Sequence, residues 1–346
     1  MKKIAIIGHF GFGGNYLDGQ TIKTKIITKE LVRQFGDEQV LKIDTHGGKK
    51  VLPKLFFQTI SALRKTKNVV MLPAHNGIKF FTPILTIFNK IFKRKLFYIV
   101  IGGWLPEYLK DKKGLEKRLK KFDGIFVETN TMKTALQNMR FQNIFVMPNC
   151  KDLKILSKEE LVYPSGEPYK WCTFSRVCKE KGIEDAVNAV KAVNEQMGRI
   201  VYTLDIYGQV DKNQTEWFEN LKATFPEYIT YGGMVEYDKS VDILKNYFAL
   251  LFPTQYYTEG IPGAIIDAYA AGVPVVCTRW ENFFDIIKDG VTGIAYDFAD
   301  KEALKQVLEK INNEPKVLNL MKVECIKLAQ IFIPLNVIKI FLEQLQ

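Results

Sequence analysis

Short apolar runs alternate with amphipathic stretches along most of the chain. The runs are rich in Val, Ile, Leu and Phe, and each is continuously apolar instead of alternating, which predicts strands buried on both faces of a parallel sheet. The stretches between them, such as residues 20–34, have one apolar face and predict helices of an α/β fold. The predicted strands are residues 2–7, 40–44, 69–72, 96–101, 124–128, 170–174, 248–253 and 273–277.

The length of the chain indicates more than one domain. The protein has 346 residues, 47% of them apolar, which is enough for two domains of ordinary size, each with its own core. Residues 163–168 are rich in Pro, Gly and Ser and predict the linker between them. No repeats or low-complexity segments occur.

Several features of the sequence favour the cytoplasm. The apolar start of the chain is too short for a signal peptide and runs into a glycine-rich loop. We find no stretch that reaches the roughly 18 apolar residues needed to cross a membrane. The cysteines are odd in number and lack C-x-x-C spacing, which favours free buried thiols. They are Cys150, Cys172, Cys178, Cys277 and Cys325.

The net charge of +11 is unevenly distributed. Residues 1–165 hold 30 Lys and Arg against 13 Asp and Glu, whereas residues 166–346 hold 19 against 25. A uniformly basic protein would suggest nucleic acid as a partner. A basic first half instead indicates that this half meets an anionic surface or substrate, and we predict no nucleic-acid partner.

Residues 258–276 carry the most informative chemistry. They lie between two predicted strands, and Pro262 and Gly272 suit the start and the end of a short helix. The N–H groups near Gly263 and Ala264 have no partner inside such a helix. Open N–H groups at a helix amino end favour phosphate, so we predict an anion site here.

Two carboxylates bracket the predicted anion site. Glu259 precedes the helix and Asp267 lies within it. Because like charges repel, we expect both to accept hydrogen bonds from sugar hydroxyls and not to touch phosphate. The stretch resembles the E-x7-E motif of glycosyltransferase family 4, the retaining nucleotide-sugar transferases with the GT-B fold, with Asp267 in place of the second Glu. The resemblance implies that Glu259 contacts the donor hexose and Asp267 the ribose.

A second motif follows the predicted strand at residues 170–174. Arg176 and Lys181 resemble the Arg and Lys with which family 4 enzymes clamp the donor diphosphate. Fixed cations aimed at a departing diphosphate lower the barrier, because negative charge grows there during the reaction. Taken without the resemblance, the two side chains are equally well explained as solvated surface charges.

The resemblance also implies an architecture and further contacts. It implies two Rossmann-like domains that face each other across a cleft, with the acceptor on residues 1–165 and the donor on residues 166–330. Residues 331–346 would form a helix that returns to the first domain. The implied donor-binding residues, besides Asp267, are Gly13, Gly14, Met234, Val235, Gly260, Ile261, Pro262, Gly263 and Ala264.

The acceptor side resembles the family least. Family members usually carry a histidine at the end of the strand that is residues 96–101 here, but this sequence has Gly103 and Trp104 at that point. No catalytic histidine is therefore carried over. His75 follows another predicted strand and is either a spatial substitute or an ordinary loop or core histidine. We place His75, Gly103 and Trp104 on the acceptor side.

The resemblance implies that a hexose is transferred, with retention, from a nucleotide diphosphate sugar, expected to be a UDP-sugar, to a hydroxyl of a saccharide. No D-x-D motif occurs, so we predict a reaction without metal or cofactor, in which Arg176, Lys181 and the helix amino end replace Mg²⁺. One alternative is an NAD-dependent oxidoreductase using the glycine loop at residues 8–15, although the spacing does not fit G-x-G-x-x-G. Another is a noncatalytic nucleotide-sugar-binding protein.

Two basic and apolar helices are predicted at residues 49–67 and 79–95. Their apolar side chains are numerous enough for a membrane interface as well as for the core. We therefore expect a cytoplasmic protein attached peripherally to the inner face of an anionic membrane, with Phe80, Phe81 and Phe88 inserted. The fitting acceptor is a lipid-linked saccharide of cell-surface polysaccharide biosynthesis.

Overall fold

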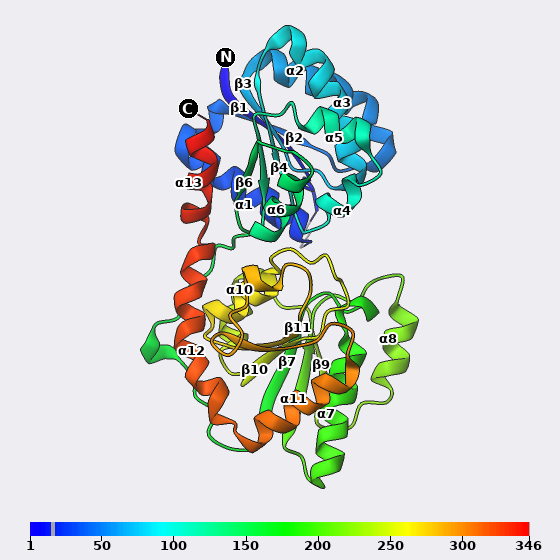
Figure 1. The fold of residues 1–346 in the computed structure, drawn as a ribbon, viewed down its shortest axis with the longest axis vertical. Coiled ribbons are helices and arrows are strands. Elements are labelled where there is room, and N and C mark those ends of the chain that lie inside the picture. The colour runs from blue at the N-terminus through cyan, green and yellow to red at the C-terminus, as the bar shows by residue number, and fades with distance from the viewer. Residues whose placement is uncertain (15–17, 346) are drawn as a thin grey trace. The chain divides into compact units, whose positions relative to one another are not determined.

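The computed structural model describes residues 1–14 and 18–345, and Figure 1 shows its ribbon. The chain forms two compact units, Met1–Asp152 with Phe332–Gln346, and Leu153–Ile331. Asn15, at the end of the predicted glycine loop, lies outside the described residues. Both units are parallel α/β sheets, which confirms the predicted pair of Rossmann-like domains.

The first unit has a six-stranded parallel sheet in the order β2-β1-β3-β4-β5-β6. Helices cover both faces of this sheet (Figure 1). The strands are β1 Lys2–Gly8, β2 Val40–Asp44, β3 Thr66–Met71, β4 Lys95–Ile99, β5 Gly124–Val127 and β6 Ile144–Val146. The helices are α1 Gly19–Phe35, α2 Leu52–Lys65, α3 His75–Phe92, α4 Leu105–Leu109, α5 Lys113–Leu119, α6 Asn130–Asn138 and α13 Pro334–Gln344.

The last helix of the chain belongs to the first unit. α13 begins at Pro334, the predicted start, where proline suits the first helical turn because its missing N–H needs no partner there. Phe341 of α13 is fully buried and packs edge-on against the rings of Phe97 and Phe126, with centroids 5.4 and 5.1 Å away. This helix therefore completes the core of the first unit.

The second unit also has six parallel strands, in the order β12-β11-β10-β7-β8-β9. α7 and α11 pack together, and α10 contacts α9 and α12 (Figure 1). The strands are β7 Tyr169–Phe174, β8 Tyr202–Tyr207, β9 Ile229–Gly233, β10 Ala249–Phe252, β11 Val275–Thr278 and β12 Gly293–Tyr296. The helices are α7 Ile183–Met197, α8 Thr215–Lys222, α9 Ser240–Leu244, α10 Gly263–Ala270, α11 Lys301–Asn313 and α12 Lys316–Ala329.

The strand order of the second unit reverses between β7 and β10, which are hydrogen-bonded neighbours. The chain moves outward from β7 through β8 to β9 on one side, and from β10 through β11 to β12 on the other. In open α/β sheets, ligands bind at the carboxyl ends of the strands where the order reverses, because the two following loops separate there. The loops after β7 and β10 carry the two predicted motifs.

One helix of the first unit begins earlier than the sequence predicts. α3 begins at His75 and not at residue 79, so His75 lies in the first helical turn and not in a loop. Farther along the chain, α4 ends at Leu109 and α5 begins at Lys113, because Lys112 leaves the helical region with φ −122° and ψ 56°.

The predicted linker lies inside the second unit. The unit begins at Leu153, ahead of the predicted boundary at residue 165. Leu156 N–H donates to the carbonyl of Ala270 at 2.9 Å, and the Leu156 and Leu161 side chains are buried. These contacts attach residues 153–165 to α10.

One helical stretch, Lys316–Glu343, has the length and hydropathy of a membrane span, which the sequence analysis did not find. It contains α12, a short 3₁₀ turn and α13. Its buried residues, such as Leu318, Met321 and Phe341, pack in the protein core, so its apolar character has a structural explanation. The five cysteines are free and buried, as predicted.

Candidate active site at the sheet switch point

The loops after β7 and β10 approach each other closely. Gly182, which ends the turn Lys179–Lys181, has a positive φ of 68°, and a Cβ there would lie 1.9 Å from the Pro253 carbonyl oxygen. Only glycine fits this position. The close approach brings the turn with Lys181 beside the loop with Glu259.

Lys181 and Glu259 form an ion pair between the Lys181 ammonium and Glu259 Oε1. Both side chains are about five-sixths buried, with 15% and 16% exposed. The Lys181 ammonium also lies 5.3 Å from the ring centroid of Phe252 and 5.2 Å from that of Tyr256. Thr254 Oγ1 donates to the same Glu259 oxygen at 3.2 Å. The structure therefore brings together one predicted cation and one predicted carboxylate in a fixed geometry.

Arg176 lies in the same loop as Lys181 but is more open. Its guanidinium donates to the Tyr256 hydroxyl at 3.2 Å and lies 3.5 Å from Asp211 Oδ2, with 54% of the side chain exposed. Tyr256 thus contacts both predicted cations. Tyr256 and Asp211 were missed by sequence reasoning, because neither belongs to the quoted motifs.

The amino end of α10 presents open N–H groups. Its first hydrogen bond is donated by Ile265 to the Pro262 carbonyl at 3.1 Å, and no bond from Gly263 or Ala264 N–H is found in the described part of the chain. Pro262 is the N-cap and not the first helical residue, and no acidic side chain lies in the first turn. Gly260 and Ile261 are buried just before it. The N–H groups at this end can donate hydrogen bonds to phosphate oxygens, and the anion site stays a prediction.

Asp267 is nearly inaccessible, with 2% exposed. Ser240, the first residue of α9, donates to Asp267 Oδ1 at 3.2 Å. The carboxylate therefore joins α10 to the segment after β9 that contains Met234 and Val235. Met234 is 63% exposed and Val235 half-buried at the carboxyl end of β9.

Replacing Asp267 by Ala is expected to weaken UDP binding by about 1.5–3 kcal/mol, the usual range for a hydrogen bond to a charged group. Calorimetry measures this directly. Ser240→Ala is the matched control, because it removes one internal hydrogen bond to Asp267 and keeps the carboxylate. An unchanged UDP dissociation constant in Asp267→Ala, together with a lower melting temperature, would make Asp267 purely structural.

The glycine loop of the first unit is organised by a carboxylate that sequence reasoning missed. Asp44, the last residue of β2, accepts hydrogen bonds from the N–H groups of Phe10 at 2.9 Å and Phe12 at 2.9 Å. Burial alone would raise the pKa of Asp44, but these backbone hydrogen bonds outweigh it and the pKa is lowered. Gly13 and Gly14 follow in an exposed turn. The N–H groups that precede the glycine pair are therefore already hydrogen-bonded to Asp44.

The predicted acceptor residues gather at the carboxyl ends of β3 and β4 in the first unit. The His75 ring lies against the Trp104 ring, with centroids 3.9 Å apart, and Tyr108 packs on both. Gly103, next to Trp104, is buried. Burial, followed by the charges of Lys79 and Lys112, lowers the pKa of His75 below its ordinary value. These surroundings favour the neutral form of the His75 ring.

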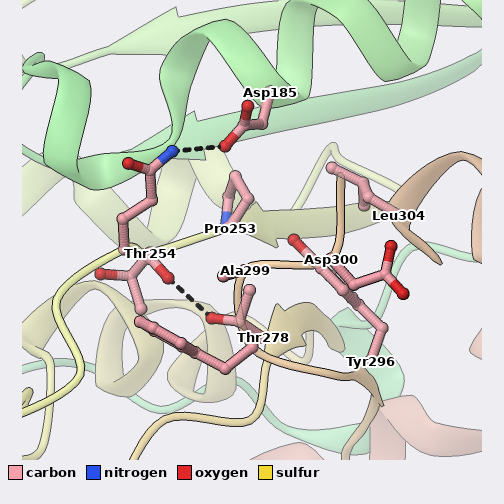
Figure 2. Close-up of a pocket in the computed structure, with 10 residues that line it drawn as sticks. Asp185, Pro253, Thr254, Thr278, Tyr296, Ala299, Asp300 and Leu304 are labelled. Carbon is pink, nitrogen blue, oxygen red and sulfur yellow. Dashed lines mark hydrogen bonds between the residues drawn. The ribbon is translucent and has the colours of Figure 1, made fainter. Parts of the chain in front are cut away.

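A separate pocket of about 300 Å³ lies beside the candidate site in the second unit (Figure 2). Gln255 Nε2 donates to Asp185 Oδ2 at 2.7 Å within it, and the Thr254 carbonyl accepts from Thr278 at 2.9 Å. Its described lining includes none of the predicted catalytic or donor residues. Thr254 alone links the pocket to Glu259.

Metal ligands are not clustered in the described residues. No group of three or more His, Cys, Asp or Glu side chains in residues 1–14 and 18–345 is arranged to hold a metal ion. The metal-independent reaction remains a prediction.

Residues 162–326 match the family described as Glycosyl transferases group 1. The amylovoran biosynthesis glycosyltransferase AmsK of Erwinia amylovora is 25% identical over 159 residues, which are 42% of this chain and 36% of AmsK. The capsular polysaccharide biosynthesis glycosyltransferase CapM of Staphylococcus aureus is 25% identical over 139 residues, 40% of this chain and 35% of CapM. The match thus spans little more than a third of each relative.

Solved structures resemble the whole chain. HepE of Anabaena, in complex with UDP and glucose, has a TM-score of 0.74 at 14% identity, covering 100% of this chain and 99% of HepE. Sucrose-phosphate synthase of Thermosynechococcus elongatus has a TM-score of 0.77 at 14% identity, covering 100% and 98%. At such low identity these likenesses show the fold alone. Residues 162–326 are therefore similar to the group 1 glycosyltransferases, within a chain that has the two-domain GT-B fold.

Proposed function

We propose that the protein transfers a hexose from a UDP-sugar to a hydroxyl of a saccharide acceptor, with retention of configuration and without a metal. The observation that carries the proposal is the ion pair of Lys181 and Glu259 beside the open amino end of α10. A cation and open N–H groups suit the diphosphate, and a carboxylate suits the hydroxyls of the hexose. HepE, whose structure contains UDP and glucose, supports this choice of donor.

The proposed mechanism follows from the negative charge that develops on the leaving diphosphate. As the bond between the sugar and the diphosphate breaks, negative charge accumulates on the diphosphate oxygens. Arg176, Lys181 and the N–H groups of Gly263 and Ala264 are donors that stabilise this charge without rearranging. No carboxylate is assigned as the nucleophile. The acceptor hydroxyl attacks from the side that the diphosphate leaves, and a phosphate oxygen takes its proton.

The test is turnover of UDP-sugars with and without EDTA. We expect slow hydrolysis of at least one UDP-hexose by the protein alone, faster consumption when a saccharide acceptor is added, and no loss in EDTA. Hydrolysis that stops in EDTA and returns with Mg²⁺ would contradict the metal-free mechanism. UDP binding without any hydrolysis would favour the noncatalytic nucleotide-sugar-binding alternative, and the absence of both would contradict the proposed function.

We further propose that the first unit binds the inner face of an anionic membrane, where a lipid-linked acceptor of cell-surface polysaccharide synthesis would be presented. CapM, a capsular polysaccharide enzyme, supports this role. α2 and α3 pack against each other through Phe56 and Phe88, whose ring centroids are 5.8 Å apart. Exposed basic residues on and beside these helices are Lys49, Lys50, Lys54, Arg64, Lys65, Lys67, Lys90 and Lys93.

The inserted side chains differ from those first predicted. Phe81 is 2% exposed and lies in the core, and Phe80 and Phe88 pack against that core. α3 has apolar residues on more than one face, and the sheet covers the face with Phe81. The exposed apolar side chains of α2 and α3 are Phe57, Ile87 and Ile91, at 70%, 49% and 73%.

Replacing Phe57 and Ile91 by Ser is expected to lower binding to vesicles of anionic lipid, measured by co-sedimentation. Each Lys or Arg near such a surface contributes about 1 kcal/mol, so binding should also require anionic lipid and weaken with salt. Leu320→Ser is the matched control, since Leu320 is 79% exposed on α12 of the second unit. No sedimentation of the unmodified protein at low salt would rule out the membrane proposal.

A further inference from the structure

The carboxyl ends of β3 and β4 carry an aromatic cluster that lies beside two lysines. We define the aromatic cluster as His75, Trp104 and Tyr108. His75 is exposed, and the other two are half-buried. Tyr108 donates its hydroxyl to the His75 carbonyl at 3.1 Å, and Trp104 Nε1 donates to the Ile101 carbonyl at 2.8 Å. These hydrogen bonds fix the rings, so the cluster is rigid before any ligand arrives.

Two lysines are held beside this cluster. The Lys112 ammonium lies 4.1 Å from the Tyr108 ring centroid, and the Lys79 ammonium lies 5.5 Å from it. Both distances are within the range of a cation–π contact, in which the negative face of the ring attracts the cation. The two ammonium groups are therefore positioned by one ring although they come from different segments.

These lysines are not neutralised by acidic side chains. The nearby carboxylates on α4 and α5 are engaged by other lysines, Glu107 by Lys110 and Glu116 by Lys113 and Lys120. No salt bridge to Lys79 or Lys112 is present within the described residues. The aromatic surface therefore lies beside two positive charges that form no ion pair within the described residues.

We propose that this cluster binds an anionic sugar of the acceptor, whose ring packs on the aromatic side chains while its carboxylate or phosphate pairs with Lys79 and Lys112. The C–H groups of a pyranose ring are weakly positive and suit the negative face of an aromatic ring. The inference rests on the proposed function, because it names the class of acceptor for that reaction. The His75 ring adds nitrogen atoms that can hydrogen-bond to sugar hydroxyls.

The test compares a neutral glucose derivative with derivatives that carry an anionic group at C6. Methyl glucuronide, methyl glucoside and glucose 6-phosphate are titrated against the protein, together with inorganic phosphate. Binding is followed by the NMR signal of the His75 ring, which is easily assigned because the chain has three histidines. At least one anionic sugar should bind about tenfold more tightly than methyl glucoside, as expected for one or two exposed ion pairs.

Lysine variants test whether Lys79 and Lys112 cause the preference for anionic sugars. Lys79→Gln combined with Lys112→Gln should remove the preference for the anionic sugars, whereas Lys117→Gln, at an exposed lysine of α5, should keep it. Equal binding of charged and neutral sugars, a preference that survives in the double variant, or equal binding of inorganic phosphate would overturn the proposal. UDP calorimetry on the same samples separates the two claims: if UDP binds but the sugars are not distinguished, only the acceptor inference fails.

Discussion

Replacing Lys181 by Ala is expected to lower kcat about 100- to 1,000-fold, corresponding to about 2.7–4 kcal/mol of lost transition-state stabilisation. Lys181 is the most buried of the predicted cations and is held between Phe252, Tyr256 and Glu259. Because charge on the diphosphate grows during the reaction, kcat should fall more than donor binding weakens. Steady-state kinetics and UDP calorimetry on the same variant measure both quantities.

Lys179→Ala is the control for this experiment. Lys179 lies in the same turn, but it is exposed and its ammonium is 5.9 Å from the Trp217 ring. Its removal should change kcat less than twofold, because exposed substitutions usually alter free energies by under about 0.5 kcal/mol. If Lys181→Ala changes only KM, Lys181 serves in ground-state binding and the proposed role in the departure of the diphosphate is wrong.

Replacing Glu128 by Ala is expected to destabilise the first unit by about 3–5 kcal/mol. Glu128 Oε1 accepts from the Lys23 ammonium at 2.6 Å, and the two side chains are 2% and 1% exposed. Removing the carboxylate leaves a buried ammonium without its counter-charge, which costs far more than an exposed ion pair contributes. Native-state hydrogen exchange of the β4 and β5 amides measures the loss.

The double variant Lys23→Met, Glu128→Leu tests the cause. An apolar pair of similar volume should recover most of the lost stability, because no unpaired charge remains buried. If the double variant is as unstable as Glu128→Ala, the loss comes from packing and not from the buried charge. Any faster exchange should in either case appear in the first unit, since the pair joins α1 to the end of β5.

Strands such as β1, β10 and β11 were predictable because they are continuous apolar runs, and such runs have few alternatives in a parallel sheet. Helix boundaries were harder. The start of α3 was missed because His75, Asn76 and Gly77 are poor helix formers. They nevertheless form the first helical turn, which is closed by the hydrogen bond from Ile78 N–H to the Ala74 carbonyl. The helix propensity of these residues therefore did not indicate where the helix begins.

The site was predictable where strand ends bring two loops together. Lys181 and Glu259 are far apart in sequence, but both follow strands that are neighbours in the sheet, so the fold brings them into contact. Asp44 was missed because an aspartate at a strand end reads as an ordinary loop residue. The partnership of Lys23 and Glu128 was missed because no local pattern connects α1 to the end of β5.

The ion pair between Lys181 and Glu259 has a consequence for selectivity between the intact donor and its fragments. Under the proposed function, a nucleotide sugar replaces both halves of the pair at once, its diphosphate facing Lys181 and its hexose hydroxyls facing Glu259. Free phosphate or UDP satisfies only the lysine, and a free sugar satisfies only the carboxylate. A fragment that binds must therefore break the ion pair between Lys181 and Glu259, and it then supplies a new partner to only one of the two side chains. The resting protein thus discriminates against abundant cellular anions and releases spent nucleotide after transfer.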